Sequence, residues 1–189
     1  MIHSFPNYQQ PDSKDCGPTC LRIVAKHFGK GISLQYIRQL SETQRMGSSL
    51  YHLSNAAEAL GLRSMGARLS LAQLEEVPLP CILYWNKNHY VVLYKVRKGT
   101  YYISDPAHGL IKYNEKELVK HWIGTGSNDN LGEGIALLLE PTPHFYDQNT
   151  NEKRQKLSLG FLSRYLLRYK SFLWQLVFGL MAGSLLQLI

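Results

Sequence analysis

The sequence contains few cysteines: three in 189 residues, and none lies in a Cys-x-x-Cys or paired-histidine spacing. Disulfide-stapled secreted domains carry several cysteine pairs, and structural zinc sites repeat such spacings. Neither class is favoured, and no metal or other cofactor is expected in this chain. The first ten residues are polar and lack the apolar stretch of a secretory signal peptide. We therefore expect a chain that works in the reducing cytosol.

The sequence also lacks the phosphate loop Gly-x-x-x-x-Gly-Lys-Ser/Thr, so ATP hydrolysis is not expected of it. It contains no basic run with interleaved aromatic residues, so the net charge of +7 does not indicate a nucleic-acid partner. Most of that charge comes from residues 152–170, where six basic residues face a single acidic one, Glu152. The rest of the chain is close to neutral.

A thiol stands where a helix is expected to begin. Gly17 and Pro18 follow Cys16, and proline is tolerated in the first turn of a helix. Residues 19–28 then carry apolar side chains at helical spacing, which would fix Cys16 at the helix tip: Leu21, Val24, Ala25 and Phe28. The free N–H groups and dipole of a helix N-terminus favour a thiolate, the nucleophilic form of cysteine. Gln10 lies upstream, and its side-chain amide, with the backbone N–H of Cys16, would form an oxyanion hole.

Among the seven histidines, His89 has the sequence context that best suits a general base. It follows a polar loop and precedes the apolar run 90–94, and a second β-prone run, residues 100–104, ends at Asp105. If these runs form a hairpin, His89 and Asp105 fall at the same end of the sheet. Asp105 would then orient the imidazole beside Cys16.

Each of these residues also has a structural interpretation. Cys16 suits a small buried residue at the start of an apolar helix, and Cys20, four residues later on the same face, would be its partner in a metal site. Cys81 lies in an apolar run and suits packing within a strand. His108 follows the aspartate in an apparent turn and is the rival base, while Asp105 before proline suits a plain turn residue.

Helical patterns dominate the first half of the chain and strand patterns the second. Helices are expected near residues 19–28, 34–40, 49–60, 71–75 and 115–122, and strands near 62–67, 81–85, 90–96, 100–104, 110–113 and 134–140. This order predicts an α+β fold with an antiparallel sheet packed on the early helices, and excludes an alternating, doubly wound sheet.

Four motifs occur in order: Gln10, Asp15-Cys16-Gly17-Pro18, His89-Tyr-Val-Val-Leu and Ile103-Ser-Asp105-Pro106. Over residues 8–141 the chain resembles the bacteriocin-processing cysteine peptidases of peptidase family C39, a papain-like group at the N-terminus of ABC exporters. The resemblance implies that Cys16 is the nucleophile, His89 the general base, Asp105 its orienting partner and Gln10 an oxyanion-hole donor. It also implies that nucleophile and base meet across a cleft between the helical and sheet halves.

The resemblance further implies a substrate and partners. Enzymes of this group remove a leader peptide after a Gly-Gly or Gly-Ala pair, and the transporter exports the released peptide. The expected substrate is a leader-bearing precursor of a bacteriocin or signalling peptide, and the expected partners are the remaining transporter domains, as a homodimer at full length. ATP is expected only in a nucleotide-binding domain outside this sequence. The alternatives are a non-cleaving module that docks the leader, and a papain-like acyl transferase or amidase.

The C-terminal quarter changes character. We expect a peptidase domain over residues 1–143, a polar linker over 144–156 and an amphipathic juxtamembrane helix over 157–170. Residues 171–189 carry no charge and would rise about 28 Å as a helix, close to the thickness of bilayer hydrocarbon. They are expected to begin the first transmembrane helix of a longer transporter, and a buried or partner-packed helix is the alternative. The basic flank would keep the peptidase domain on the cytosolic side of the bacterial inner membrane.

Overall fold

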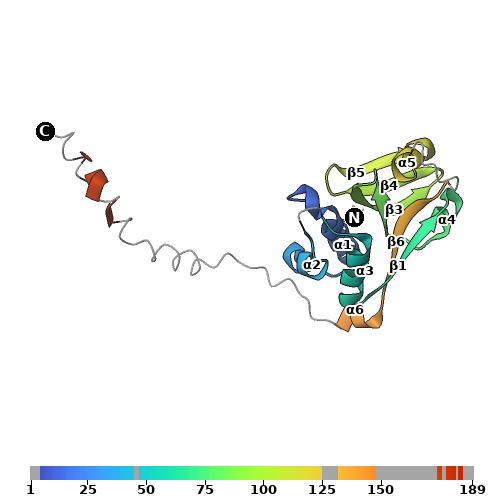
Figure 1. Ribbon diagram of the computed structural model, residues 1–189, viewed down its shortest axis with the longest axis horizontal. Helices are drawn as coiled ribbons and strands as arrows, with labels where there is room; N and C mark the ends of the chain where they lie inside the picture. The colour runs from blue at the N-terminus through green and yellow to red at the C-terminus, as the bar shows by residue number, and fades with distance from the viewer. Residues whose placement is uncertain are drawn as a thin grey trace, which may run out of the picture. The chain divides into compact units, whose positions relative to one another are not determined.

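The computed structural model describes residues 5–44, 47–124 and 132–147 and, near the C-terminus, 174–175, 178–181 and 183–184 (Figure 1). The chain divides into two units, Met1–Asn151 and Glu152–Ile189, and each is treated by itself. The expected juxtamembrane segment, 157–170, and most of the expected transmembrane start, 171–189, lie outside the described residues. Among the residues that are described, no helix is both long and apolar enough to cross a bilayer.

The first unit holds all the named helices and strands. In chain order they are η1 (Ser13–Asp15), α1 (Cys16–His27), α2 (Leu34–Leu40), α3 (Leu50–Ala59), β1 (Leu62–Leu69), α4 (Leu71–Glu76), β2 (Cys81–Trp85), β3 (His89–Arg97), β4 (Thr100–Asp105), β5 (Gly109–Asn114), α5 (Glu115–Trp122), β6 (Gly134–Pro141) and α6 (Pro143–Asp147). The predicted order of helices and strands is confirmed.

The strands form one antiparallel sheet in the order β1-β6-β2-β3-β4-β5 (Figure 1). The chain therefore runs through three consecutive hairpin-like pairings, β2 to β5, and inserts its last strand, β6, between β1 and β2. With the early helices packed against this sheet, the predicted α+β class is confirmed.

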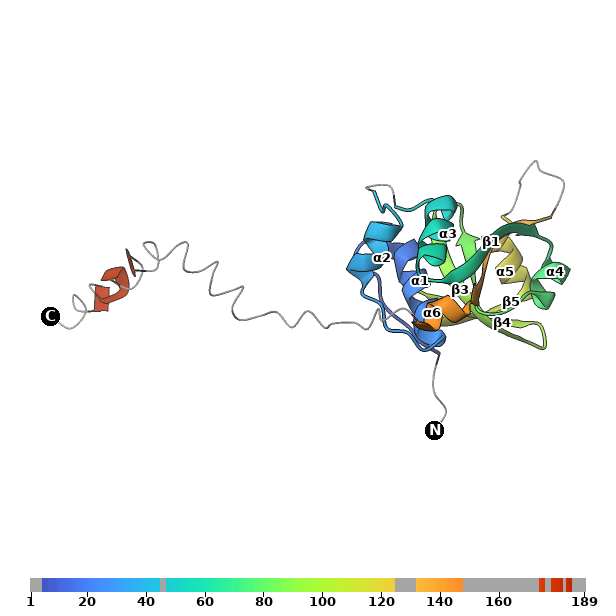
Figure 2. The same cartoon turned by 90° about the horizontal axis from the view of Figure 1, so that it is seen from below.

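Both faces of the central strands are buried, because side chains alternate between two apolar clusters. On β3, Tyr90 and Val92 join the cluster of α1, α2 and α3, whereas Val91 and Leu93 join the cluster of α4 and α5. Figure 2 shows α1, α2, α3 and α6 gathered on one side of the strands and α4 and α5 on the other. This two-sided burial explains the continuous apolar run of β3, which is typical of a strand covered on both faces.

Side-chain caps set the starts of four helices. Ser33, Ser49, Ser70 and Asn114 each accept a hydrogen bond from a backbone N–H of the first turn of the helix that follows. Ser70 and Asn114 complete reciprocal capping boxes with Gln73 and Glu117. The predicted bounds of α2 and α5, residues 34–40 and 115–122, agree with the structure.

Helix α6 lies where the sequence predicted the beginning of a linker. Residues 144–147, the first residues of that predicted linker, belong to α6. Phe145 is fully buried in the cluster of α1 to α3, and its ring lies edge-on to Phe28 at 6.4 Å. A Cβ on Gly61 would lie 2.6 Å from the backbone nitrogen of Phe145, so glycine permits this close approach. A single aromatic residue thus anchors to the core a stretch whose composition is otherwise polar.

Candidate active site

Helix α1 carries Cys16 as its first residue, and the thiol-bearing residue is only 5% exposed. The helix packs on β3, with Leu21, Val24 and Ala25 fully buried. A Cβ on Gly17 would lie 2.8 Å from Leu53 Cδ1 on α3, so glycine at this position allows α3 to pack directly beside the turn that carries Cys16. The helix starts three residues earlier than predicted, so that Cys16 itself lies in the first turn.

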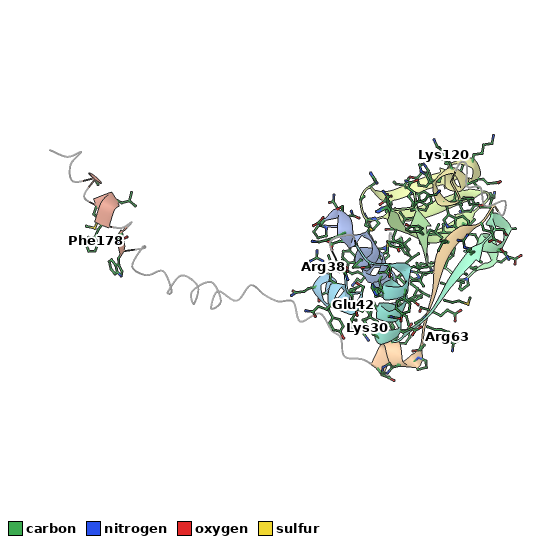
Figure 3. The ribbon with its side chains drawn as sticks, in the orientation of Figure 1. Lys30, Arg38, Glu42, Arg63, Lys120 and Phe178 are labelled. Atoms are coloured by element: carbon green, nitrogen blue, oxygen red, sulfur yellow. The ribbon has the colours of Figure 1, made fainter. Side chains whose placement is uncertain are left out.

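Asp15, which precedes the thiol, is fully buried and paired with Arg38 on α2. Arg38 Nε donates to Asp15 Oδ1 at 2.7 Å and its Nη2 donates to Oδ2 (Figure 3 labels Arg38). This two-point contact raises the pKa of Arg38. Arg38 is not evident from the sequence, because α2 follows after a loop and no local pattern shows that it reaches back to the start of α1.

The β3–β4 hairpin brings His89 and Asp105 together. His89 begins β3 and Asp105 ends β4, and the antiparallel register pairs Val92 with Ser104. His89 Nε2 lies 2.8 Å from Asp105 Oδ1. The structure therefore places these two residues at the same end of the sheet, as the hairpin hypothesis required.

The electrostatics of this pair favour a protonated histidine beside an ionised aspartate. Burial disfavours the imidazolium, yet hydrogen bonds with Asp105 and Cys16, and the charges of both, raise the pKa of His89 from 6.5 to about 9. Burial likewise opposes the carboxylate, but hydrogen bonds from His89, the Ala107 N–H and His108 lower the pKa of Asp105 from 3.8 to about 2. Because Nε2 faces Asp105, the other ring nitrogen, Nδ1, is the one available to interact with Cys16.

Gln10 lies on the segment that leads from the N-terminus to α1. Its backbone N–H donates to the carbonyl of Pro106 at 2.9 Å, which ties it to the turn directly after Asp105. Its side-chain Oε1 is buried, and within the described part of the chain that atom has no hydrogen-bond partner. The structure thus brings Gln10 close to the turn that follows Asp105. Its side-chain amide does not use all of its hydrogen-bonding capacity within the described part of the protein.

The rival residues do not take the positions of His89 and Cys16. His108 Nδ1 lies 2.8 Å from Asp105 Oδ2, on the opposite oxygen from His89. Cys20 and Cys81 are fully buried, and burial raises the pKa of both thiols, that of Cys81 to about 12. Neither thiol is therefore a nucleophile at neutral pH. In the parts of the chain that the structure describes, no cluster of three or more His, Cys, Asp or Glu residues is arranged to hold a metal ion.

Comparison with known proteins gives relatives over most of the described unit. The chain is 34% identical over 119 residues to the colicin V secretion/processing ATP-binding protein CvaB of Escherichia coli, covering 63% of this chain and 17% of that protein. It is 32% identical over 186 residues to the lactococcin-G-processing and transport ATP-binding protein LagD of Lactococcus lactis, covering 95% of this chain and 24% of that protein. The chain thus spans less than a quarter of the length of these relatives.

Solved structures of similar shape agree. A double glycine motif protease from an AMS/PCAT transporter, crystallised with the leader peptide, matches with a TM-score of 0.66 at 30% identity, covering 74% of this chain and 93% of that one. The peptidase domain of Streptococcus ComA matches with a TM-score of 0.64 at 24% identity, covering 74% of this chain and all of that one, and supports the fold. Residues 4–126 match the sequence profile of the Peptidase C39 family, so the predicted resemblance is confirmed and the chain belongs to that family.

Proposed function

We propose that this chain is a cysteine endopeptidase that removes double-glycine leader peptides from precursor peptides. Cys16 is the nucleophile, His89 the general base and Asp105 the residue that orients it. The observation that carries the proposal is the position of His89: its Nε2 lies 2.8 Å from Asp105 Oδ1, and Cys16 as well as Asp105 raises its pKa, so the thiol and the carboxylate both act on this imidazole. A base held between a thiol and a carboxylate is the arrangement that nucleophilic catalysis by cysteine requires.

Acylation uses these three residues together. The Cys16 thiol gives its proton to His89, and the thiolate attacks the carbonyl carbon at the end of the leader. A C–S bond forms, and the carbonyl electron pair moves onto oxygen. The Gln10 amide and the Cys16 backbone N–H stabilise that oxyanion, a contribution of about 3 kcal/mol per donor. When the carbonyl re-forms, the C–N bond breaks and His89 gives its proton to the departing amine of the mature peptide.

Deacylation reverses the proton flow. His89, now neutral, accepts a proton from water, and the oxygen of that water attacks the thioester carbonyl. The C–S bond breaks, Cys16 leaves as thiolate, and the leader is released as a carboxylic acid, which gives its remaining proton to solvent. His89 ends as the imidazolium, which its contact with Asp105 favours at neutral pH.

The substrate class rests on the relatives. The solved structure at 30% identity is a double glycine motif protease in complex with a leader peptide, and the fold match covers nearly all of that chain. Relatives such as CvaB and LagD are processing and secretion or transport proteins with ATP-binding function. On this basis we infer that the chain acts on leader-bearing peptides as part of a peptide exporter.

The same relatives support a membrane location. We infer that the unit Met1–Asn151 works on the cytosolic side of the bacterial inner membrane, joined to transporter domains that bind ATP, and that the full-length protein is a homodimer. In this proposal residues 148–156 are the linker, 157–170 the juxtamembrane segment and 171–189 the start of a transmembrane helix.

The direct test is cleavage of a precursor that carries a Gly-Gly leader, followed by mass spectrometry. The purified chain is compared with Cys16→Ala and with Cys81→Ala, which removes a buried thiol from the opposite face of the sheet. Cleavage after the glycine pair by the unmodified chain and Cys81→Ala, and not by Cys16→Ala, is expected. Cleavage that survives Cys16→Ala would reject the nucleophile, and leader binding without cleavage would favour the docking module.

A further inference from the structure

The carboxylate of Asp105 is held by two histidines. Its Oδ1 accepts hydrogen bonds from His89 Nε2 and from the backbone N–H of Ala107, each at 2.8 Å. Its Oδ2 lies 2.8 Å from His108 Nδ1. The side chain of Asp105 is 5% exposed and that of His108 is 72% exposed, so the second imidazole stands between the carboxylate and solvent.

The β4–β5 hairpin fixes the position of His108. The register of these strands pairs Asp105 with Gly109, which leaves a short loop, residues 106–108, between them. Gly109 has a φ of +91°, a conformation that favours glycine, and a Cβ there would lie 3.6 Å from Asn7 Nδ2. The tight loop therefore turns the imidazole of His108 back onto the carboxylate three residues earlier.

We propose that His108 is a positioning residue that fixes the plane of the Asp105 carboxylate and thereby the orientation of His89. This inference rests on the proposed function. An aspartate carboxylate turns readily about its last side-chain bond, and Oδ1 alone does not fix that plane. With both oxygens held, Oδ1 stays directed at His89. Without His108, Oδ2 is open to water, and the contact between Oδ1 and His89 Nε2 is held less firmly.

The groups around the carboxylate allow this effect to be measured. Besides the two histidines, Cys16 and Cys20 on α1 and Tyr113 on β5 interact with this pair through charge. Burial raises the pKa of Cys20 and that of Tyr113, so both stay neutral over the working range. A change in the orientation of the Asp105 carboxylate therefore changes the pKa of His89, because the carboxylate contacts Nε2 of that imidazole.

The experiment compares three variants of the chain: His108→Ala, His108→Gln, which keeps a side-chain N–H donor, and the matched control His52→Ala. His52 is a histidine facing a carboxylate, Glu42 at 3.8 Å, in another part of the domain. Two experiments are made: steady-state kinetics, giving kcat and KM for a Gly-Gly precursor across pH, and nitrogen-15 NMR, giving the protonation midpoint of the His89 imidazole.

For His108→Ala we expect a loss of about five-fold in kcat, the size of one orienting hydrogen bond, with KM little changed. The His89 midpoint is expected to move down from about 9, because its imidazolium loses part of its support. His108→Gln restores most of both quantities, and His52→Ala leaves both unchanged.

A fall in melting temperature of His108→Ala with unchanged kcat and an unchanged His89 midpoint would overturn the inference, because His108 would then only stabilise the turn. Failure of the unmodified chain to cleave any Gly-Gly precursor would instead remove the proposed function. The NMR midpoint does not depend on turnover, so in that case it still decides whether His108 controls the Asp105–His89 contact.

Discussion

His89 Nε2 and Asp105 Oδ1 lie 2.8 Å apart although 16 residues separate them in the chain. The contact is made by antiparallel pairing: β3 leaves the site, turns, and β4 returns to it. Both strands are buried where they approach the site, at residues 90–93 of β3 and 103–105 of β4, which makes this end of the hairpin a rigid support. Rigid strands hold catalytic groups more accurately than loops do, and the pair is placed where each strand meets a loop.

Replacing Asp105 by alanine is expected to reduce kcat by about 100-fold or more, because His89 loses both its orienting partner and the charge that stabilises its imidazolium. Steady-state cleavage of a Gly-Gly precursor measures this. Asp12→Ala is the control, since the Asp12 side chain is exposed and makes its hydrogen bond and its ion pair with the neighbouring Ser13 and Lys14. An Asp105→Ala enzyme with full kcat would show that His89 needs no orienting carboxylate.

The stability of the fold is expected to depend on pH through His89. Its folded-state pKa of about 9 is above its ordinary value of 6.5, so the folded state binds more protons between these values. The contribution of His89 is therefore fully present below about pH 6.5 and is lost as pH rises toward 9. Asp105 has a pKa lowered to about 2, so its effect on stability has the opposite pH dependence. Its contribution to the free energy of unfolding is present above pH 3.8 and is lost as the pH falls through 2.

Urea unfolding at pH 6, 7, 8 and 9.5 measures this dependence. The free energy of unfolding should fall across the series, and His89→Gln should flatten the curve over the same range. Equal slopes in the two proteins would mean that another group produces the loss of stability.

Much of the site was readable in the sequence because it depends on local signals. Gly17 and Pro18 indicate a helix that begins near Cys16, although its first residue was predicted three positions too late, and the two strands follow from apolar runs on either side of a glycine turn. The turn residues Lys98 and Gly99 have positive φ values of 49° and 68° and close the hairpin. Once the hairpin forms, the meeting of His89 and Asp105 requires no long-range information.

The features that the sequence did not reveal depend on contacts between distant segments. Arg38 reaches Asp15 only because α2 packs on α1, and Phe145 is buried only because Gly61 leaves room for α6. The sequence context of His108 suits a rival base, and its contact with the second oxygen of Asp105 depends on the conformation of a three-residue loop. A local sequence pattern predicts the helix or strand to which a residue belongs. It does not predict which residues from distant segments will contact it.

Arg38→Met is expected to destabilise the fold by about 3 kcal/mol, because it leaves the carboxylate of Asp15 buried without a partner. Arg63→Met is the matched control: Arg63 is exposed and lies 3.9 Å from Glu140, and surface pairs of this kind contribute about 0.5 kcal/mol (Figure 3 labels both arginines). Chemical unfolding of the two variants measures the difference. The double variant Asp15→Asn with Arg38→Met should recover part of the loss, and its failure to do so would mean that packing of the Arg38 stem matters more than the charge.

The boundary of the domain can be tested at α6. Phe145 is fully buried and its neighbour Tyr146 is exposed, so the two adjacent aromatic residues form a matched pair. Phe145→Ala removes a core side chain and should cost about 3 kcal/mol, with a clear fall in melting temperature, whereas Tyr146→Ala should change stability by less than about 0.5 kcal/mol. Because the Phe145 ring also contacts Phe28 just beyond the end of α1, the loss should loosen the end of that helix remote from Cys16. Hydrogen exchange of the α1 amides would locate it there. If the two variants were equally stable, α6 would not belong to the folded domain, and the linker would begin at residue 144.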